Sequence, residues 1–517
     1  MDVPGRVRVT LADRIVPGGF FVDRPDAPTR TPFEGSLSDD AMPYRHCWTY
    51  AGGGSTIRGE LVAMLDAATE KVFVGTLFLG DRAVREALER AADRLRGGVY
   101  VISALDDKGL DKAINTVDDD GDIDKQTEYR NFRELTRRGI YVRGYPGLHA
   151  KFVVVDDRLA LVSSANLVSR SFDQVGENGV VVTRPADATH LARLFARLWE
   201  ESPWDMPPDR EHYQVRPRAA AQRVSQVSVT ETVGNGPIWT YAAQHSILDA
   251  ISEIIDSAQH ELVLASYSIA NMTHSLPRMV ARPELLFEPV RRAIDRGVRV
   301  SLLLRGRNNV QASRVEAKAF AEAGVEVYAD RLTHGKAAIA DGRLGALFSA
   351  NFLTDLGLVG GVEVGMRVDD TPALAEALRY YKHVIAEADL AFVRDPSLGA
   401  LAKRLYAEAL SRWPLPAVIT LISGDAGWQR LADGTGPVLF ERSGSGSVTL
   451  HSGQDRWLLT ASGKEANDGY RLDPLPGKTV RSATEQLEAW LTTRQRVPEG
   501  IHRGLCPAAF VRPQAGR

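Results

Sequence analysis

Two segments of the sequence carry the same polar residue types at the same spacing. Each has a histidine, a lysine two positions later, an aspartate five positions after the lysine, and a serine and an asparagine eight and ten positions after the aspartate. The two sets are His149, Lys151, Asp156, Ser164 and Asn166, and His334, Lys336, Asp341, Ser349 and Asn351. A match of five residues in register indicates that both segments serve one chemical purpose.

That residue set suits the cleavage of a phosphodiester. The reaction needs a nucleophile that attacks phosphorus, an acid that protonates the departing oxygen, and donors that hold the other oxygens as negative charge develops. Two imidazoles can act as nucleophile and acid, while two lysines and two asparagines can hold the oxygens. These groups supply the charge that a metal ion would otherwise bring, and the sequence has no clustered carboxylates that would demand one. We therefore expect a phosphodiester site without a metal or any other cofactor.

The periodicity of β-strands would place these side chains together. Residues two apart on a strand project to the same face, so His149 and Lys151 should converge, as should the second pair. Asp157-Arg158 and Asp341-Gly342 are typical of tight turns, which predicts that each motif forms a β-hairpin. The serine and asparagine are again two apart. Each half should therefore present histidine, lysine, serine and asparagine to one point.

The sequence around the two motifs also repeats. The tetrapeptide Trp48–Ala51 recurs as Trp239–Ala242, 191 residues later. Each copy is followed by a helical pattern, an apolar strand and further strands and helices in the same order. Each half should close with an amphipathic helix, and Thr371-Pro372 suits the start of the second one. Strands that alternate with helices in both halves predict an α/β fold.

At the paired motifs the sequence resembles the phospholipase D superfamily, whose mark is HxKxxxxD followed by a Gly-Ser-x-Asn element. The resemblance covers about residues 46–400. It implies two α/β lobes related by a pseudo-twofold axis, with both motifs in one cleft. It also implies that one histidine forms a phosphohistidine, while the other protonates the leaving group and then activates the acceptor. By analogy with family members in which the earlier histidine attacks, we assign His149 as nucleophile and His334 as acid.

The resemblance extends to a carboxylate that orients each histidine. In related enzymes this carboxylate follows the asparagine, and Glu177 and Glu363 occupy the matching places. The motif aspartates are structural in the family and should fix the hairpin. One departure is that the glycine before the motif serine is replaced by Ser163 in the first half and by Phe348 in the second. We expect the replacement in the second half to narrow the site near Phe348.

The composition changes along the chain divide it into five segments. After about residue 415 short apolar runs are separated by Gly, Ser and Asp, which predicts a small β-rich region with a helix at 482–493. A polar, proline-containing stretch between the two halves predicts a linker. The expected segments are a leader (1–44), a first phospholipase D-like lobe (45–205), a linker (206–237), a second such lobe (238–405) and a C-terminal domain (415–517).

Composition limits the class of protein. Among the 517 residues, 63 Lys and Arg oppose 66 Asp and Glu, for a net charge of −3, so any polyanion must be bound locally. The two cysteines, Cys47 and Cys506, are too few for a disulfide framework or a cysteine-based zinc site. No apolar stretch resembles a signal peptide or a membrane span. These features predict a cytoplasmic protein and leave the oligomeric state open.

The motif leaves the substrate open, because nucleases and lipid enzymes of the family use the same residues. The expected cytosolic location and the segment after Asn351 favour a nuclease that acts on DNA or RNA, in DNA processing or bacterial defence. The run Asn166-Leu-Val-Ser-Arg170-Ser171 is closer to the lipid-processing members, which keeps a phospholipase or phosphatidyltransferase as the alternative. A third hypothesis is a catalytically inactive, phospholipase D-like binding protein.

Two further groups of charged residues bear on ligand binding. Arg305 and Arg307 follow an apolar strand, and loops at strand ends commonly reach the ligand, so both are candidate phosphate contacts. The acidic run 118–124 does not fit a calcium loop, because Thr127 stands where that loop requires a glutamate. We expect it to be an exposed acidic loop.

Overall fold

The computed structural model describes most of the two repeated halves and five strands of the C-terminal region. The described residues are 15, 18–35, 42–50, 55–106, 109–110, 125–206, 215–273, 285–308, 310–397 and 400, and the strands between 428 and 470. They form two compact units. The larger unit comprises Asp26–Arg305 and Ala319–Asp389, and the smaller unit contains Met1–Pro25, Gly306–Lys318 and Leu390–Arg517.

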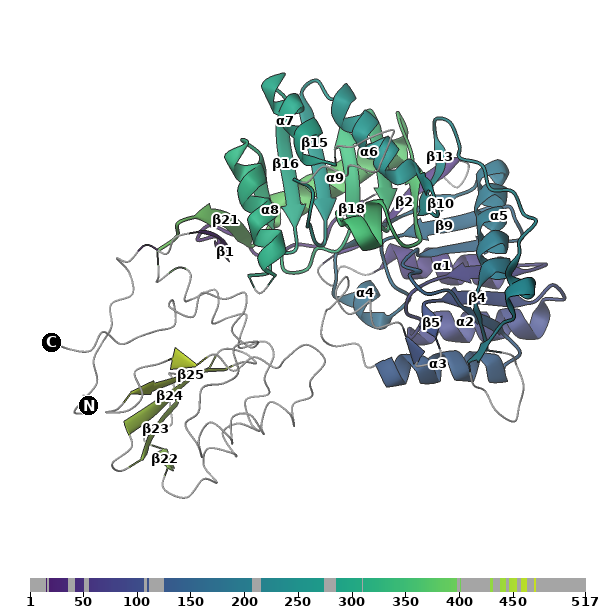
Figure 1. Cartoon of the computed structure of the whole chain (residues 1–517), viewed down its shortest axis with the longest axis horizontal. Coiled ribbons are helices and arrows are strands. Elements are labelled where there is room, and N and C mark those ends of the chain that lie inside the picture. Colours follow the sequence, from purple (N-terminus) through teal and green to yellow (C-terminus); the bar gives the residue numbers. More distant parts are fainter. Residues whose placement is uncertain are drawn as a thin grey trace. The chain divides into compact units, whose positions relative to one another are not determined.

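The first half folds around a mixed sheet in the order β12-β11-β7-β4-β3-β8-β9-β10-β2 (Figure 1). Its strands are β2 (Tyr44–Thr49), β3 (Val72–Gly75), β4 (Val99–Ser103), β7 (Tyr141–Gly144), β8 (Phe152–Val155), β9 (Leu159–Ser163), β10 (Glu177–Val182), β11 (Trp204–Met206) and β12 (Arg216–Pro217). Its helices are α1 (Thr56–Ala67), α2 (Arg82–Arg94), α3 (Lys125–Arg137), α4 (Ser169–Asp173) and α5 (Pro185–Glu201). A short hairpin, β5 (Leu105–Asp106) and β6 (Gly109–Leu110), follows β4, and a 3₁₀ turn lies at Ala220–Arg223.

The second half builds the same sheet in the order β17-β16-β15-β18-β19-β20-β13-β14. Its strands are β13 (Gly236–Tyr241), β14 (Gln244–His245), β15 (Glu261–Ser266), β16 (Arg299–Leu304), β17 (Glu326–Ala329), β18 (Lys336–Ala340), β19 (Leu344–Phe348) and β20 (Glu363–Arg367). Its helices are α6 (Ser246–Ser257), α7 (Phe287–Asp295), α8 (Gln311–Glu322) and α9 (Pro372–Glu387), with a short irregular turn at Thr354–Leu358 in which Leu356 and Gly357 are not helical.

Seven strands of the two sheets correspond in order and direction, from β7 to β2 in the first half and from β17 to β13 in the second. In the first, β3 pairs in parallel with β4 and β4 with β7, while β3, β8, β9, β10 and β2 pair antiparallel in turn. In the second, β15, β16 and β17 are parallel, and β15, β18, β19, β20 and β13 are antiparallel. The predicted α/β repeat is therefore confirmed, and each motif lies on the predicted hairpin, β8–β9 or β18–β19.

The sequence dictates where the helices begin. Ser55 and Asp81 cap the first turns of α1 and α2 by accepting hydrogen bonds from backbone N–H groups. Thr371 caps α9 in the same way, with Pro372 in the first turn, as predicted. Helix α5 buries the stripe of Leu191, Leu194 and Leu198 that its periodicity predicts. No described helix is long and apolar enough to cross a membrane.

The described strands of the smaller unit are one antiparallel pair and a separate five-stranded sheet. Strand β1 (Gly19–Asp23) pairs antiparallel with β21 (Leu390–Arg394), and Phe21 packs edge-on against Phe392. The five described strands of the C-terminal region, β22 to β26, form an antiparallel sheet. Their bounds are Trp428–Arg430, Val438–Arg442, Gly446–Ser452, Trp457–Ser462 and Gly469–Tyr470. The helix expected at 482–493, Cys506 and the acidic run 118–124 lie outside the described residues.

Candidate active site

In each motif the lysine ammonium contacts the ring of the histidine. The Nζ of Lys151 lies 2.8 Å from Nε2 of His149 and donates a hydrogen bond to the His149 carbonyl. The Nζ of Lys336 lies 3.1 and 3.2 Å from the two ring nitrogens of His334. All four side chains are buried, with no residue more than 3% exposed. The spacing of two residues therefore produces the predicted convergence.

The histidines lie just outside the strands that were expected to carry them. Strand β8 begins at Phe152 and β18 begins at Lys336. The backbone N–H groups of His149 and Ala150 donate to the carbonyl of Val362 in the other lobe, at 2.9 and 2.8 Å. Likewise, His334 and Gly335 both donate to the carbonyl of Gly176 at 2.8 Å. These backbone groups bond across the lobes, so they are not available to the hairpin ladder.

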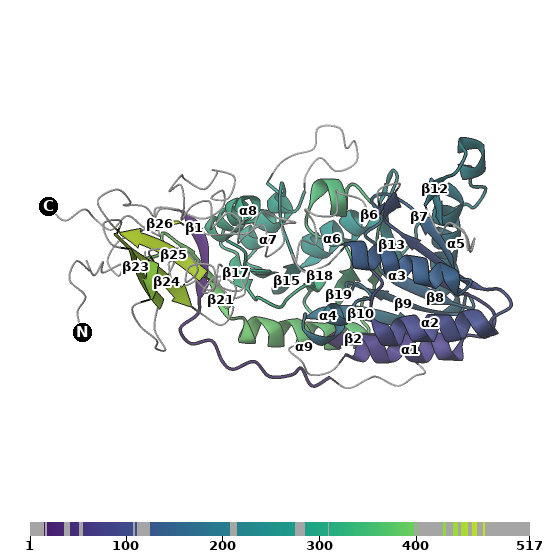
Figure 2. The same ribbon diagram turned by 90° about the horizontal axis from the view of Figure 1, so that it is seen from below.

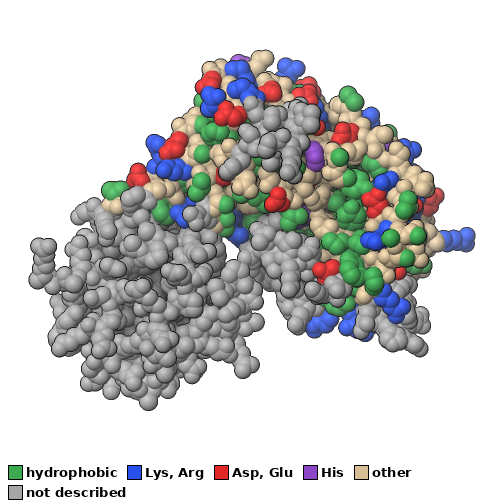
Figure 3. Space-filling view, viewed as in Figure 1, with side chains coloured by type: hydrophobic (Ala, Val, Ile, Leu, Met, Phe, Trp, Pro, Cys, Tyr) green, Lys and Arg blue, Asp and Glu red, His purple; other side chains and the backbone are tan. Residues whose placement is uncertain are grey.

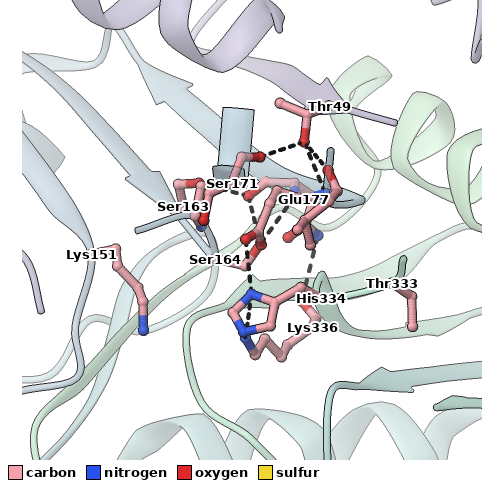
Figure 4. A network of polar contacts seen from close by, with 12 residues as sticks. Thr49, Lys151, Ser163, Ser164, Ser171, Glu177, Thr333, His334 and Lys336 are labelled. Carbon is pink, nitrogen blue, oxygen red and sulfur yellow. Dashed lines mark hydrogen bonds and ion pairs between the residues drawn. The ribbon is translucent and has the colours of Figure 1, made fainter. Parts of the chain in front are cut away.

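The orienting glutamates are exchanged between the lobes. The Nδ1 of His149 lies 2.7 Å from Oε1 of Glu363. The Nδ1 of His334 lies 2.8 Å from Oε1 of Glu177, a contact that Figure 4 shows. Both glutamates are fully buried. The sequence located these two residues but did not indicate which histidine each would hold. The exchange unites both motifs in a single site.

The motif serines hold these glutamates instead of facing the same point as the histidines. Ser164 donates to Oε2 of Glu177 at 2.5 Å, and Ser349 donates to Oε2 of Glu363. The expectation that serine would join the histidine and lysine directly is therefore corrected: β9 ends at Ser163, so Ser164 no longer follows the strand alternation. Each serine fixes a carboxylate that reaches the histidine of the other lobe.

Glu177 carries a negative charge despite its burial. Burial raises the pKa of Glu177, but the ring of His334 and the ammonium of Lys336, together with the Ser164 hydroxyl, outweigh this effect and lower it. Its backbone N–H donates to the hydroxyl of Thr49 at 3.1 Å. An ionised carboxylate at this position keeps a proton on Nδ1 of His334 and so directs Nε2 toward the reaction.

The repeated tetrapeptide has a role that the sequence did not reveal. Thr49 pairs with Glu177 on neighbouring strands, and Thr240 pairs with Glu363 in the same register. Thr49 also donates to the carbonyl of Val175. The recurrence of the threonine in both halves was the available signal, because it lies opposite the orienting glutamate in each.

Both asparagines begin a tight turn at the end of the second hairpin strand. The backbone carbonyls of Asn166 and Asn351 accept from the residue two positions on, at 2.8 and 2.7 Å. The Asn351 side chain is completely buried, and within the described part of the chain neither its Nδ2 nor its Oδ1 has a hydrogen-bond partner. A buried amide of this kind can form hydrogen bonds to a bound ligand.

The motif aspartates anchor the hairpins to the neighbouring strand. Asp156 and Asp341 adopt positive φ angles of 53° and 54° at the turns. Asp156 accepts hydrogen bonds from Thr69 and from the N–H groups of Glu70 and Lys71, at 2.7 to 2.9 Å. Burial raises the pKa of Asp156, yet these donors outweigh it and lower the pKa to about 2. Asp341 accepts the equivalent hydrogen bonds from the N–H groups of residues 259–261, at the start of β15.

The remaining candidate residues lie in different surroundings. Arg305 lies beside the second motif, since its guanidinium carbon is 5.6 Å from the centre of the Tyr267 ring, which packs edge-on against His334 at 4.8 Å. Arg307 belongs to the smaller unit and remains a prediction. Ser163, which replaces the family glycine, donates to the carbonyl of Asn178, and Phe348 is buried against Phe352. Throughout the described ranges, no three His, Cys, Asp or Glu side chains are grouped to hold a metal ion.

Several solved structures resemble this chain. Phosphatidylserine synthase from Haemophilus influenzae Rd KW20 is 14% identical, with 71% of this chain and 91% of that chain covered and a TM-score of 0.48. Polyphosphate kinase from Porphyromonas gingivalis is 14% identical, with 66% and 50% covered and a TM-score of 0.40. Nuc from Salmonella typhimurium, a phospholipase D family member, is 21% identical, with 31% and 99% covered and a TM-score of 0.26.

A match of the sequence to a family model identifies the family of the chain. No protein with a curated function matches the chain. The family model described as the cardiolipin synthase, phospholipase D-like domain matches twice, at residues 61–199 and 251–385, which together make up just over half of the chain. These two matches coincide with the two sheets and carry one copy each of the His, Lys and Glu set. The chain therefore belongs to the phospholipase D superfamily and contains its phosphodiesterase-type domain twice.

Proposed function

We propose that this protein is a metal-independent phosphodiesterase that works through a phosphohistidine, and that its substrate is a nucleic acid. The observation that carries the proposal is the pair of buried His–Lys contacts, each completed by a glutamate from the other lobe. Two oriented imidazoles in one site can attack phosphorus and protonate the departing oxygen within the same complex.

In the first step His149 attacks. Its Nδ1–H donates to Glu363, which leaves the lone pair of Nε2 to form a bond to phosphorus. The bond between phosphorus and the departing oxygen breaks, and His334 transfers the proton of its Nε2 to that oxygen. Glu177 stabilises the charged ring of His334 before the transfer.

In the second step the phosphohistidine is hydrolysed. His334, now neutral at Nε2, takes a proton from water, and the resulting hydroxide attacks phosphorus. The bond from phosphorus to Nε2 of His149 breaks, and both histidines return to their starting state. The same residue thus serves as acid and then as base, as microscopic reversibility requires.

The lysines and asparagines would hold the non-bridging oxygens. Lys151 and Lys336 each contact a histidine ring, so their ammonium groups lie within reach of a phosphorus bonded to Nε2. The amide of Asn351 can donate to the same oxygens, and Asn166 occupies the equivalent position of the first lobe. These donors stabilise the charge that develops on the oxygens in the transition state.

A lipid substrate remains the second candidate, because one feature favours it. Arg170 and Ser171, which resemble the run of lipid-processing members, form α4 directly after the Asn166 turn. The second lobe has an irregular turn at the corresponding place, Thr354–Leu358, so the two sides of the site differ. We favour a nucleic-acid substrate because the sequence that follows Asn351 is closer to the nuclease-like members of the family.

The test compares substrates in the presence of EDTA. The full-length protein is incubated with single- and double-stranded DNA, RNA and short-chain phosphatidylcholine, beside His149→Asn and the control His260→Asn, an exposed histidine. We expect nucleic acid to be cleaved in EDTA by the wild type and the control, and not by His149→Asn. Cleavage of lipid alone would contradict the nuclease proposal, and loss of all activity in EDTA would contradict the metal-free mechanism.

A covalent intermediate gives a second readout of the same proposal. With bis(p-nitrophenyl) phosphate labelled at phosphorus, whose leaving group departs without protonation, and rapid alkaline quenching, we expect label on the wild-type chain and more label on His334→Asn, in which hydrolysis of the intermediate lacks its base. Peptide mapping should place the label on His149. Label on His334 in the His149→Asn variant would reverse the two roles.

A further inference from the structure

The loop that leads into His334 is held by the side chain of Asp330. Its Oδ1 accepts hydrogen bonds from the N–H groups of Leu332 at 2.6 Å and Thr333 at 3.1 Å. The carbonyl of Leu332 accepts in turn from the N–H of Gly176 at 2.8 Å, next to Glu177. Asp330 therefore orders the backbone on both sides of the His334–Glu177 contact.

Asp330 depends on an arginine from far earlier in the chain. Arg30 contacts Oδ2 of Asp330 through Nη2 at 2.6 Å and through Nε at 3.2 Å. The Asp330 side chain is completely buried, and Arg30 also lies 3.0 Å from Asp389. Burial raises the pKa of Asp330 and the charge of Arg30 opposes that rise. Without Arg30, the buried carboxylate would lose its closest counter-charge.

Residues 26–35, here called the arm, are anchored on both lobes. The N–H of Thr31 donates to Glu387 at 2.9 Å, and Nε2 of His383 lies 3.0 Å from the Thr31 carbonyl. The ring of Phe33 packs edge-on against Trp48 of the first lobe and Tyr380 of the second. Figure 2 shows the arm as a purple trace along α9. Its fixed position allows Arg30 to reach Asp330.

The first lobe holds its histidine in a different way. Tyr145 occupies the place of Asp330, since the N–H of each bonds to the end of the preceding parallel strand, at Ser103 and Leu304. There the turn is closed by the backbone, from the N–H of Leu148 to the carbonyl of Tyr145 at 3.1 Å. The ion pair with the arm is thus specific to the His334 side of the site.

We propose that Arg30 is a positioning residue for His334 and acts through Asp330. The proposal rests on the proposed function, in which His334 protonates the leaving group. Because proton transfer requires close alignment of the donor, a shift of the Asp330–Thr333 loop weakens the acid more than it weakens attack by His149.

The test uses two phosphodiesters that differ in their need for an acid. Phenolate leaves poorly without protonation, whereas p-nitrophenolate leaves readily, so diphenyl phosphate depends on His334 more than bis(p-nitrophenyl) phosphate does. For Arg30→Gln in the full chain, we expect kcat/KM for diphenyl phosphate to fall on the order of tenfold more than for the nitrophenyl ester. Arg30→Lys, which keeps the charge but not the two-point contact, should recover part of the loss.

The matched control is Arg331→Gln. Arg331 is half exposed and contacts Asp389 of the same acidic cluster, so this variant removes a neighbouring charge without removing the contact to Asp330. We expect its ratio of the two kcat/KM values to equal that of the wild type. Thermal melting identifies a folding defect, and Arg30→Lys supplies the measurement if Arg30→Gln does not fold.

The outcomes separate this proposal from the proposed function. An unchanged ratio in Arg30→Gln, or an equal loss on both esters, would overturn the positioning role of Arg30. If His149→Asn cleaved both esters as fast as the wild type, the proposed function would fail instead. A selective loss on diphenyl phosphate, with Arg331→Gln normal, would support both.

Discussion

Each motif histidine is completed by a residue far away in sequence. His149 and Glu363 are 214 positions apart, yet their side chains meet at 2.7 Å. Glu177 lies close in sequence to His149 but contacts His334. The pattern of residue types located both glutamates, because a carboxylate after the asparagine orients a histidine in the family. Their pairing could not be predicted, because it depends on how strand ends from two lobes meet in space.

The exchanged pairs predict different defects for two equivalent substitutions. Glu177→Gln weakens the hold on His334, the acid, so kcat/KM should fall more for diphenyl phosphate than for bis(p-nitrophenyl) phosphate. Glu363→Gln weakens the hold on His149, the nucleophile, so both esters should lose rate alike. We expect losses of about 10- to 100-fold, smaller than the roughly 10²- to 10⁴-fold that a general acid or base contributes, because each histidine itself remains. Because the structure fixes which glutamate holds which histidine, the reverse pattern would mean that His334 is the nucleophile and His149 the acid.

The elements that carry the motifs follow from local sequence to a large extent. Alternation of apolar strands with amphipathic helices predicted the α/β repeat, and turn residues predicted both hairpins. The start of the motif strands could not be predicted, because Val362 and Gly176 of the opposite lobe take the N–H groups of the histidines. Contacts between lobes are long-range, and no periodicity within one lobe encodes them.

One difference between the hairpins has a physical cause in helix α9. Between histidine and lysine the first motif has Ala150 and the second has Gly335. A Cβ at Gly335 would lie 2.7 Å from the hydroxyl of Tyr381, which itself accepts from Nδ2 of Asn178 at 2.7 Å. The tyrosine therefore occupies the space that an alanine would need.

We expect Gly335→Ala to destabilise the protein by about 1–3 kcal/mol, the usual cost of an overpacked core. Tyr381→Phe removes the clashing oxygen, so the double variant should be more stable than the sum of the single effects by more than about 0.5 kcal/mol. Ala150→Gly is the matched control in the other hairpin and should show no coupling to Tyr381→Phe. Urea unfolding measures the three single and the two double variants, and additive effects of Gly335→Ala and Tyr381→Phe would argue against the clash.

At the scale of the whole molecule, charge is nearly balanced. The net charge is −3, and Figure 3 shows acidic and basic side chains interspersed on the visible face of the larger unit. Many of the arginines are paired with carboxylates, as Arg367 is with Glu253 and Asp369. Among the described residues, Lys151 and Lys336 contact the two histidines and Arg305 lies beside the second motif, so these three charges can meet a phosphodiester locally.

This distribution predicts a shallow dependence of activity on salt. Each charge that neutralises a phosphate of single-stranded DNA contributes a slope of about −0.7 to a plot of log(kcat/KM) against log salt concentration. With two or three such charges, we expect a slope of about −1.5 to −2, and Arg305→Gln should reduce its magnitude by about 0.7. Short-chain phosphatidylcholine, which is zwitterionic, should show almost no slope.

Arg343→Gln provides the control for net charge, because Arg343 is exposed and pairs with Asp370. It changes the total charge by the same amount as Arg305→Gln and should leave the slope unchanged. A slope several times steeper would indicate an extended basic surface that binds many phosphates. A slope that Arg343→Gln and Arg305→Gln reduce equally would mean that the global charge attracts the substrate, which would remove Arg305 from the site.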